Sequence, residues 1–317
     1  MIRTFIKSFT SYAVFFTFWA ASTSTCMAAG TTASPVADHP WFFWPLILFV
    51  FCFFLGILAV LAGVGGGVLY VPLVSGFFPF HLDFVRGTGL FVALAGALAA
   101  GPGLLKRNLA NLRLALPVAL IASTSAIAGA LLGLSLPTRF IQISLGATII
   151  LIAALLTFSK NVERPDVKQQ DKLSMVLGMS GSYLESSTGQ DIEWRTHRTI
   201  PGLILFVIIG FMAGMFGLGA GWANIPVLNL IMGAPIKVAV GTSKFLLSIT
   251  DTSAAWIYLN QGCIIPLLAV PSIVGLMLGS FVGVRILAVA KPKFIRYIVI
   301  CVLFFAGLRA FMKGMGI

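Results

Sequence analysis

Charged residues are scarce in this chain of 317 residues. Only 9% of the residues are charged, 59% are hydrophobic and the mean hydropathy is +1.03. A soluble domain carries roughly 25% charged residues, so this composition excludes a protein whose whole surface faces water. The sequence therefore predicts a multi-pass protein of the cytoplasmic (inner) cell membrane.

Cysteine and histidine are also scarce. The four cysteines are scattered without a Cys-x-x-Cys pair, and no histidine lies near them at ligand spacing. This spacing indicates neither a disulfide framework nor a zinc site, and no cofactor is expected. No histidine or carboxylate is placed to activate a thiol, so we expect no catalytic residues, and a sulfur-handling membrane enzyme is only a minor alternative.

Acidic residues are rarer than basic ones, which leaves a formal net charge of +12. In a soluble protein this excess would suggest nucleic acid as a partner. Here Lys and Arg concentrate at the ends of apolar segments, where they orient helices across the membrane. The expected partners are therefore the lipid bilayer and a small anionic substrate, and no nucleic acid is expected. The sequence leaves open whether the protein forms a homo-oligomer.

Long apolar segments dominate what the sequence does contain. Two shorter apolar segments, 66–80 and 220–233, either cross the membrane or re-enter it. If both cross, the basic loop 106–113 and the connector 159–199 fall on the cytoplasmic side, as the positive-inside bias requires, so crossing is favoured. The eight long candidate spans are 41–62, 84–105, 114–136, 140–158, 200–216, 238–259, 264–284 and 297–312.

The chain divides into four parts. Residues 1–29 fit a signal peptide cleaved near Ala28 or Ala29, with an uncleaved helix as the alternative. A first membrane repeat (41–158) and a second (200–314) flank the connector 159–199, which holds six of the nine acidic residues. Alternating residues around Ser187-Thr188-Gly189 predict a β-hairpin there, with Asp191 and Glu193 on a solvated face.

A glycine motif occurs twice. Gly63-Val64-Gly65-Gly66-Gly67 followed by Pro72 recurs at an offset of 154 residues as Gly217-Leu218-Gly219-Ala220-Gly221 followed by Pro226. An odd number of passes per repeat would insert the copies with opposite orientation. The predicted fold is an all-α polytopic membrane protein with two inverted-topology repeats of four long helices plus one short or re-entrant segment each. A duplicated scaffold without transport is the alternative.

Glycine clusters that open short apolar helices indicate an anion site. The unpaired N–H groups and partial positive charge of a helix N-terminus attract anions, although such glycines can also serve close helix packing. Hydroxyl and amide groups at matched positions add donors that carry no charge. The predicted substrate-binding residues are Gly65, Gly66, Gly67, Thr88, Gly219, Gly221, Asn224, Thr242, Ser243 and Lys244.

Ionisable residues inside spans are functional candidates. Lys244 is placed to neutralise an anion, or else to snorkel towards the cytoplasmic interface. Asp251, seven residues later on the same helix face, is the only carboxylate deep in a span and the candidate for proton coupling. Asp83 and Arg86 are expected at the outer edge of their span, with Arg86 as an interfacial anchor or as a guide for anions.

The doubled motif, together with Gly181-Ser182-Tyr183 and the stretch Ala234 to Ser243, resembles the sulfite exporter TauE/SafE family over about residues 45–315. The resemblance implies a secondary transporter that exports sulfite, an organosulfonate or a related organic anion by alternating access. The alternatives are an anion channel, or a membrane scaffold or sensor acting through the connector. Ala220, Trp222 and Asn224 depart from the family pattern, so the resemblance does not single out sulfite among these anions.

Overall fold

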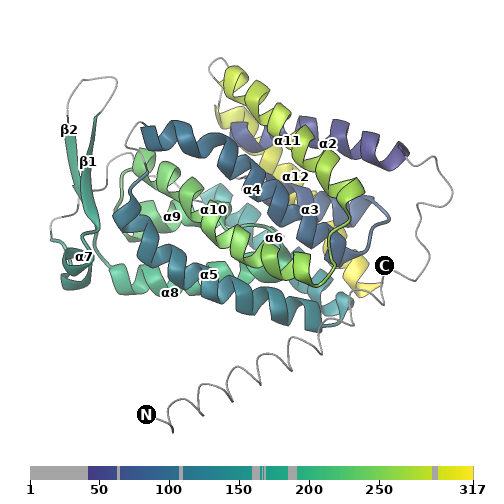
Figure 1. Cartoon of the computed structure of the whole chain (residues 1–317), viewed down its shortest axis with the longest axis horizontal. Helices are drawn as coiled ribbons and strands as arrows, with labels where there is room; N and C mark the ends of the chain where they lie inside the picture. The colour runs from purple at the N-terminus through teal and green to yellow at the C-terminus, as the bar shows by residue number, and fades with distance from the viewer. Residues whose placement is uncertain are drawn as a thin grey trace, which may run out of the picture.

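The structure is a computed structural model, and it describes residues 42–62, 65–106, 110–158, 165, 167, 169–184, 191–287 and 292–316. The signal-peptide prediction for residues 1–29 lies outside these residues. Within them the protein is a bundle of helices with one small hairpin at its end (Figure 1). The all-α prediction for the membrane part is confirmed.

The first repeat and the connector hold the elements up to residue 195. The connector contributes the short helix α7 and the strands β1 and β2. The bounds are α2 Phe43–Ala62, α3 Gly66–Phe77, α4 Leu82–Lys106, α5 Leu112–Ser135, α6 Thr138–Phe158, α7 Lys172–Val176, β1 Ser180–Leu184 and β2 Asp191–Arg195.

The second repeat holds the remaining elements. Its short helix α9 continues directly into a wider π-helical turn, η2. The bounds are α8 Thr199–Phe216, α9 Gly221–Pro226, η2 Val227–Ile231, α10 Ile236–Asn260, α11 Pro266–Leu287 and α12 Pro292–Met315.

Among the described helices, α2, α4, α5, α6, α8 and α11 are long and apolar enough to span a membrane, which makes six. Helices α10 and α12 are as long as predicted, with 25 and 24 residues, but they are less apolar because they carry internal charges. Helix α10 packs against α4 and α5 inside the bundle, where the side chains of Thr242, Ser243, Thr250 and Asp251 are buried.

Each short helix returns the chain to the side from which the preceding long helix started. Phe78, just after α3, contacts Trp44 at the start of α2, with ring centroids 6.2 Å apart. In the second repeat, the backbone N–H of His197, just before α8, donates to the carbonyl oxygen of Met232 after η2 (3.0 Å). This geometry agrees with crossing segments and differs from short re-entrant loops.

The two repeats are interleaved. Helix α2 of the first repeat packs along α11 of the second, and α8 of the second packs along α5 of the first. The pairs α4–α10 and α6–α12 also join one helix from each repeat (Figure 1). The buried core therefore runs between the repeats, and neither repeat encloses a separate core of its own.

The predicted hairpin is confirmed in the connector. β1 pairs antiparallel with β2, with Tyr183 opposite Ile192. Asp191 and Glu193 are exposed, as expected for a solvated face. The predicted turn at 187–189 lies outside the described residues.

Further hydrogen bonds fix the connector to the membrane helices. The side chain of Asp171 accepts hydrogen bonds from the backbone N–H (3.0 Å) and the hydroxyl (2.9 Å) of Thr199, the first residue of α8. The Asn111 amide donates to the carbonyl oxygen of Ser180 in β1 (3.4 Å). The connector and the start of α5 therefore lie on one side of the bundle, which agrees with their predicted common side.

The cysteines differ from expectation at one position. Cys52 and Cys301 are free, but Cys263 is disulfide-bonded. The scattered spacing gave no indication of this bond, because spacing along the sequence does not reveal which distant thiols a fold brings together.

Candidate functional site

The two glycine clusters meet in the core. A Cβ atom on Gly67 would lie 2.6 Å from the carbonyl oxygen of Leu218, and one on Gly89 would lie 2.7 Å from the carbonyl oxygen of Gly217. A Cβ on Gly217 would collide with the backbone of Arg86. Such close backbone approach is possible only without side chains, so part of the motif serves helix packing, as the alternative reading predicted.

Matched glycines adopt matched conformations. Gly65 has a φ of 92° and Gly219, its counterpart at the same offset, has a φ of 72°, a region that residues with a Cβ rarely occupy. Neither α3 nor α9 has a side-chain hydrogen bond at its N-cap. The N-terminal N–H groups of both short helices thus receive no acceptor from a capping side chain.

Asp251 lies at this junction of the repeats. Its side chain is fully buried in α10, and a Cβ on Gly219 would lie 2.9 Å from its Oδ2 atom. Ala93 of α4 packs against both Gly67 and Gly219. Asp251, the candidate coupling residue, therefore contacts the second glycine cluster, and Ala93 connects this contact to the first cluster.

Asp251 has little to compensate its burial. The backbone of Ala220 approaches it, but neither carboxylate oxygen has a hydrogen bond of regular geometry within the described residues. Buried polar groups almost always have partners. A carboxylate left in this state points to a group that arrives from outside the protein, such as a proton or a ligand.

Lys244 lies two turns before Asp251 on the same helix and is half-buried. The two charges influence one another, but no ion pair joins them within the part of the chain that the structure describes. Its ammonium group therefore has no direct counter-ion among the described residues. A half-buried side chain is compatible both with anion binding and with snorkelling.

Further buried polar atoms that have no partner in the described part of the chain occur on α9 and α10, which pack against one another. They are the indole N–H of Trp222, the amide oxygen of Asn224 and the hydroxyls of Ser243 and Thr250. Asn224 and Ser243 belong to the predicted site. Trp222 and Thr250 were not in that prediction. The sequence could have indicated them, because they lie next to Asn224 and Asp251 along the chain.

Other predicted residues have different surroundings. The hydroxyl oxygen of Thr242 accepts a hydrogen bond from the backbone N–H of Asn111 (3.2 Å), so it ties α10 to the start of α5. Gly66 packs on Leu276 and Val92, which are apolar, and a Cβ on Gly65 would meet nothing within 4 Å. These residues shape the backbone at the junction.

Thr88 belongs to a second polar cluster that the prediction missed. The hydroxyl of Tyr70, in α3, is hydrogen-bonded to the side chains of Ser272 (3.4 Å) and Thr88. Cys52 is also hydrogen-bonded to Ser272. Tyr70 corresponds to Asn224 by the offset of 154 residues, but its polar group is satisfied while that of Asn224 is not.

Arg86 is not an interfacial anchor. Only 1% of the residue is exposed, and its side chain donates to the hydroxyl of Tyr258 (3.1 Å) and the carbonyl oxygen of Gly133 (3.2 Å), with Asp83 at 3.4 Å. It therefore joins α4, α5 and α10 inside the bundle. An arginine near a span end usually reaches the interface, but here the two helices supply acceptors deeper in the protein.

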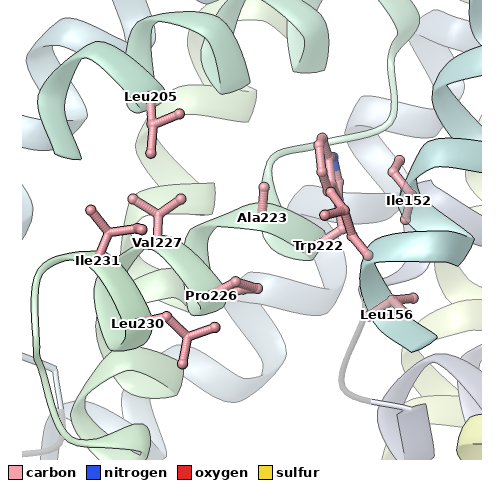
Figure 2. Close-up of a pocket in the computed structure, with 10 residues that line it drawn as sticks. Ile152, Leu156, Leu205, Trp222, Ala223, Pro226, Val227, Leu230 and Ile231 are labelled. Atoms are coloured by element: carbon pink, nitrogen blue, oxygen red, sulfur yellow. The ribbon is translucent and has the colours of Figure 1, made fainter. Parts of the chain in front are cut away.

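An apolar cavity of about 370 Å³ adjoins the site (Figure 2). Figure 2 shows the indole of Trp222 beside Ile152 and Leu156, with Val227, Ile231 and Leu205 across the cavity. Leu155 and Leu230 on its rim are exposed by 48% and 38%, so the cavity opens towards lipid. Trp222 thus belongs both to the lining of this cavity and to the set of unpartnered polar groups on α9 and α10.

No group of three or more potential metal ligands occurs within the described residues. A helical bundle that crosses the membrane many times, with buried charges and unpaired polar groups at the meeting point of two repeats, defines a membrane transporter. The comparisons with known proteins agree with this class.

The model of the family described as Sulfite exporter TauE/SafE matches residues 48–310. The chain therefore belongs to this family. It is similar to the probable membrane transporter protein YunE of Bacillus subtilis, with 23% identity over 85% of this chain and 98% of that protein. No solved structure matches the chain.

Two other relatives carry the same kind of name. The probable membrane transporter protein ORF9 of Sinorhizobium sp is 26% identical over 80% of this chain and 87% of its own length. The probable membrane transporter protein MJ0441 of Methanocaldococcus jannaschii is 24% identical over 83% and 94%. The protein is thus a membrane transporter and not an enzyme.

Proposed function

We propose that this transporter is a secondary carrier that exports a small anion across the cytoplasmic membrane by alternating access. The observation that carries the proposal is the buried polar cluster at the junction of the glycine motifs. Among the described residues, Lys244 has no direct counter-ion there and several polar atoms have no hydrogen-bond partner. A transporter leaves such groups unpaired because its substrate completes them.

The unpartnered groups suit an oxyanion. The hydroxyl of Ser243 and the indole N–H of Trp222 are free donors among the described residues, and such groups bind oxyanions without adding charge. Lys244 supplies the positive charge. Sulfite, an organosulfonate or a related organic anion fits this set, and the names of the relatives do not specify a substrate.

Asp251 gives the site a coupling function. An anion beside a buried carboxylate places two negative charges close together, and two such groups do not both stay ionised readily. We infer that Asp251 carries a proton when the anion is bound. Transport then depends on the proton gradient as well as on the substrate gradient.

Alternating access is supported by the interleaved helix pairs. In chain order, helices α2, α4, α5 and α6 of the first repeat correspond to α8, α10, α11 and α12 of the second. Replacing each helix by its counterpart turns the pair α2–α11 into the pair α8–α5. The same replacement leaves the pairs α4–α10 and α6–α12 unchanged. This pattern suits a pseudo-two-fold axis between inverted repeats, which is a common architecture of carriers with a central site. Rocking the repeats about the glycine junction would expose the site to each side in turn.

The test is uptake into proteoliposomes that contain the purified protein. Radiolabelled sulfite, sulfate, sulfoacetate and acetate are each supplied with and without an imposed pH gradient. We expect saturable uptake of at least one anion and a change of its rate with the gradient. No flux across the whole panel would count against an anion carrier and in favour of a scaffold or sensor.

A further inference from the structure

Two cations line a second cavity, at the end of α3 opposite to the glycine cluster. The cavity measures about 590 Å³ and is lined by residues 76 and 77 at the end of α3 and by Phe305, Leu308, Arg309, Met312 and Lys313 of α12. It contains no acidic residue, and no Asp or Glu occurs anywhere in the chain after Asp251.

Both cations are held in place by the end of α3. The Nε atom of Arg309 donates to the carbonyl oxygen of Gly76, and the Nζ atom of Lys313 donates to that of Ser75, both at 2.7 Å. The guanidinium carbon of Arg309 also lies 4.4 Å from the centre of the Phe77 ring. The two side chains therefore have fixed positions rather than free ends.

Helix capping does not account for both charges. A helix C-terminus carries only about half a negative charge, whereas Arg309 and Lys313 carry two positive charges. The ion pairs among the described residues join Asp83 to His81 and Arg86, and neither reaches α12. The remaining N–H groups of Arg309 and Lys313 thus have no anionic partner among the residues that the structure describes.

The cavity changes from apolar to charged along α12. Phe305, Arg309 and Lys313 follow one another at intervals of four residues and so share one face of the helix. Phe305 is 66% exposed and Leu308 is 39% exposed, so the deeper part of this face meets acyl chains. The cations lie nearer the helix end, at the depth where lipid phosphates are found.

The second repeat offers a comparison within the same molecule. By the offset of 154 residues, Arg309 corresponds to Leu155 and Gly76 to Leu230, and both leucines line the apolar cavity of Figure 2. The two cavities thus occupy corresponding places in the two repeats. Only the one on α12 contains cations, so cations are not needed to build this groove.

We propose that the cavity between α3 and α12 binds an anionic phospholipid. The phosphate group lies between Arg309 and Lys313, and an acyl chain lies along Phe305 and Leu308. The counterpart cavity at Leu155 takes acyl chains without selecting a head group. This proposal rests on the membrane insertion of the bundle and is independent of the transport substrate.

The experiment measures which lipids stay bound to the full-length protein. The protein is purified in a mild detergent, and its retained phosphatidylglycerol and phosphatidylethanolamine are quantified by mass spectrometry against the membrane extract. We expect phosphatidylglycerol to be enriched, and Arg309→Gln and Lys313→Gln each to lower its retention about fivefold. The double variant should show no enrichment.

Matched variants separate charge from folding. Arg309→Lys keeps the charge and should keep the enrichment even if the contact with Phe77 weakens. Leu155→Gln alters the counterpart cavity at a similar exposure and should leave phosphatidylglycerol retention unchanged. Gel filtration of each variant shows that the lipid is lost from a folded protein.

Two results would overturn the proposal. Equal retention of phosphatidylglycerol in the wild type and in the double variant would return the two cations to a purely structural role at the end of α3. Stabilisation of the delipidated protein by inorganic phosphate, without any effect of phosphatidylglycerol vesicles, would identify a site for a soluble anion instead.

Discussion

Lys244 is the residue on which the anion assignment depends most directly. Its side chain is half-buried on α10 and has no direct counter-ion among the described residues. We expect Lys244→Gln to lower anion uptake about 30-fold or more, because the charge that the substrate would pair with is lost. Uptake into proteoliposomes measures the effect. Lys237→Gln on the same helix is the control and should keep wild-type flux, and normal flux in both variants would exclude Lys244 from the site.

Asp251 governs coupling rather than binding in the proposed mechanism. Asparagine keeps the shape of the side chain but cannot exchange a proton. We expect Asp251→Asn to retain exchange of labelled for unlabelled anion and to lose the acceleration by a pH gradient. The control is Thr252→Val, because Thr252 follows Asp251 directly on α10 and is exposed. A pH-gradient response that survives in Asp251→Asn would place the coupling group elsewhere.

At the scale of elements, the glycine junction determines how closely the repeats approach. Gly217 and Gly262 both have a φ of 69°, but a Cβ on Gly217 would collide with Arg86, whereas one on Gly262 would meet nothing within 4 Å. Alanine at either position introduces backbone strain of about 1 kcal/mol. We expect Gly217→Ala to add about 1–3 kcal/mol of overpacking.

Thermal unfolding of the detergent-purified variants tests this difference. The melting temperature should fall clearly more in Gly217→Ala than in Gly262→Ala. Equal melting temperatures would mean that the helices relax around the added methyl group and that the close approach at Gly217 is not required.

At the scale of the whole molecule, alternating access predicts counterflow. Vesicles loaded with unlabelled substrate should transiently accumulate labelled substrate above its external concentration, because a carrier exposes one site to one side at a time. A channel gives conductance without such accumulation. Vesicles with Lys244→Gln protein provide the negative control. A steady, non-saturating current in planar bilayers would show that the protein is an anion channel and not a carrier.

The sequence by itself determined the membrane class, the number and approximate bounds of the helices, the hairpin and the family. These follow from local signals: apolar length, charge position and the repeated glycine motif. It also identified Lys244 and Asp251, because ionisable residues stand out in apolar sequence.

Only the tertiary structure decided which of these groups meet. It placed Asp251 against Gly219, engaged Thr242 with Asn111, buried Arg86 among three helices and set two cations of α12 at the end of α3. These contacts join residues more than thirty positions apart, and most of them join different repeats. No local pattern encodes such pairs, because they depend on how the interleaved helices pack.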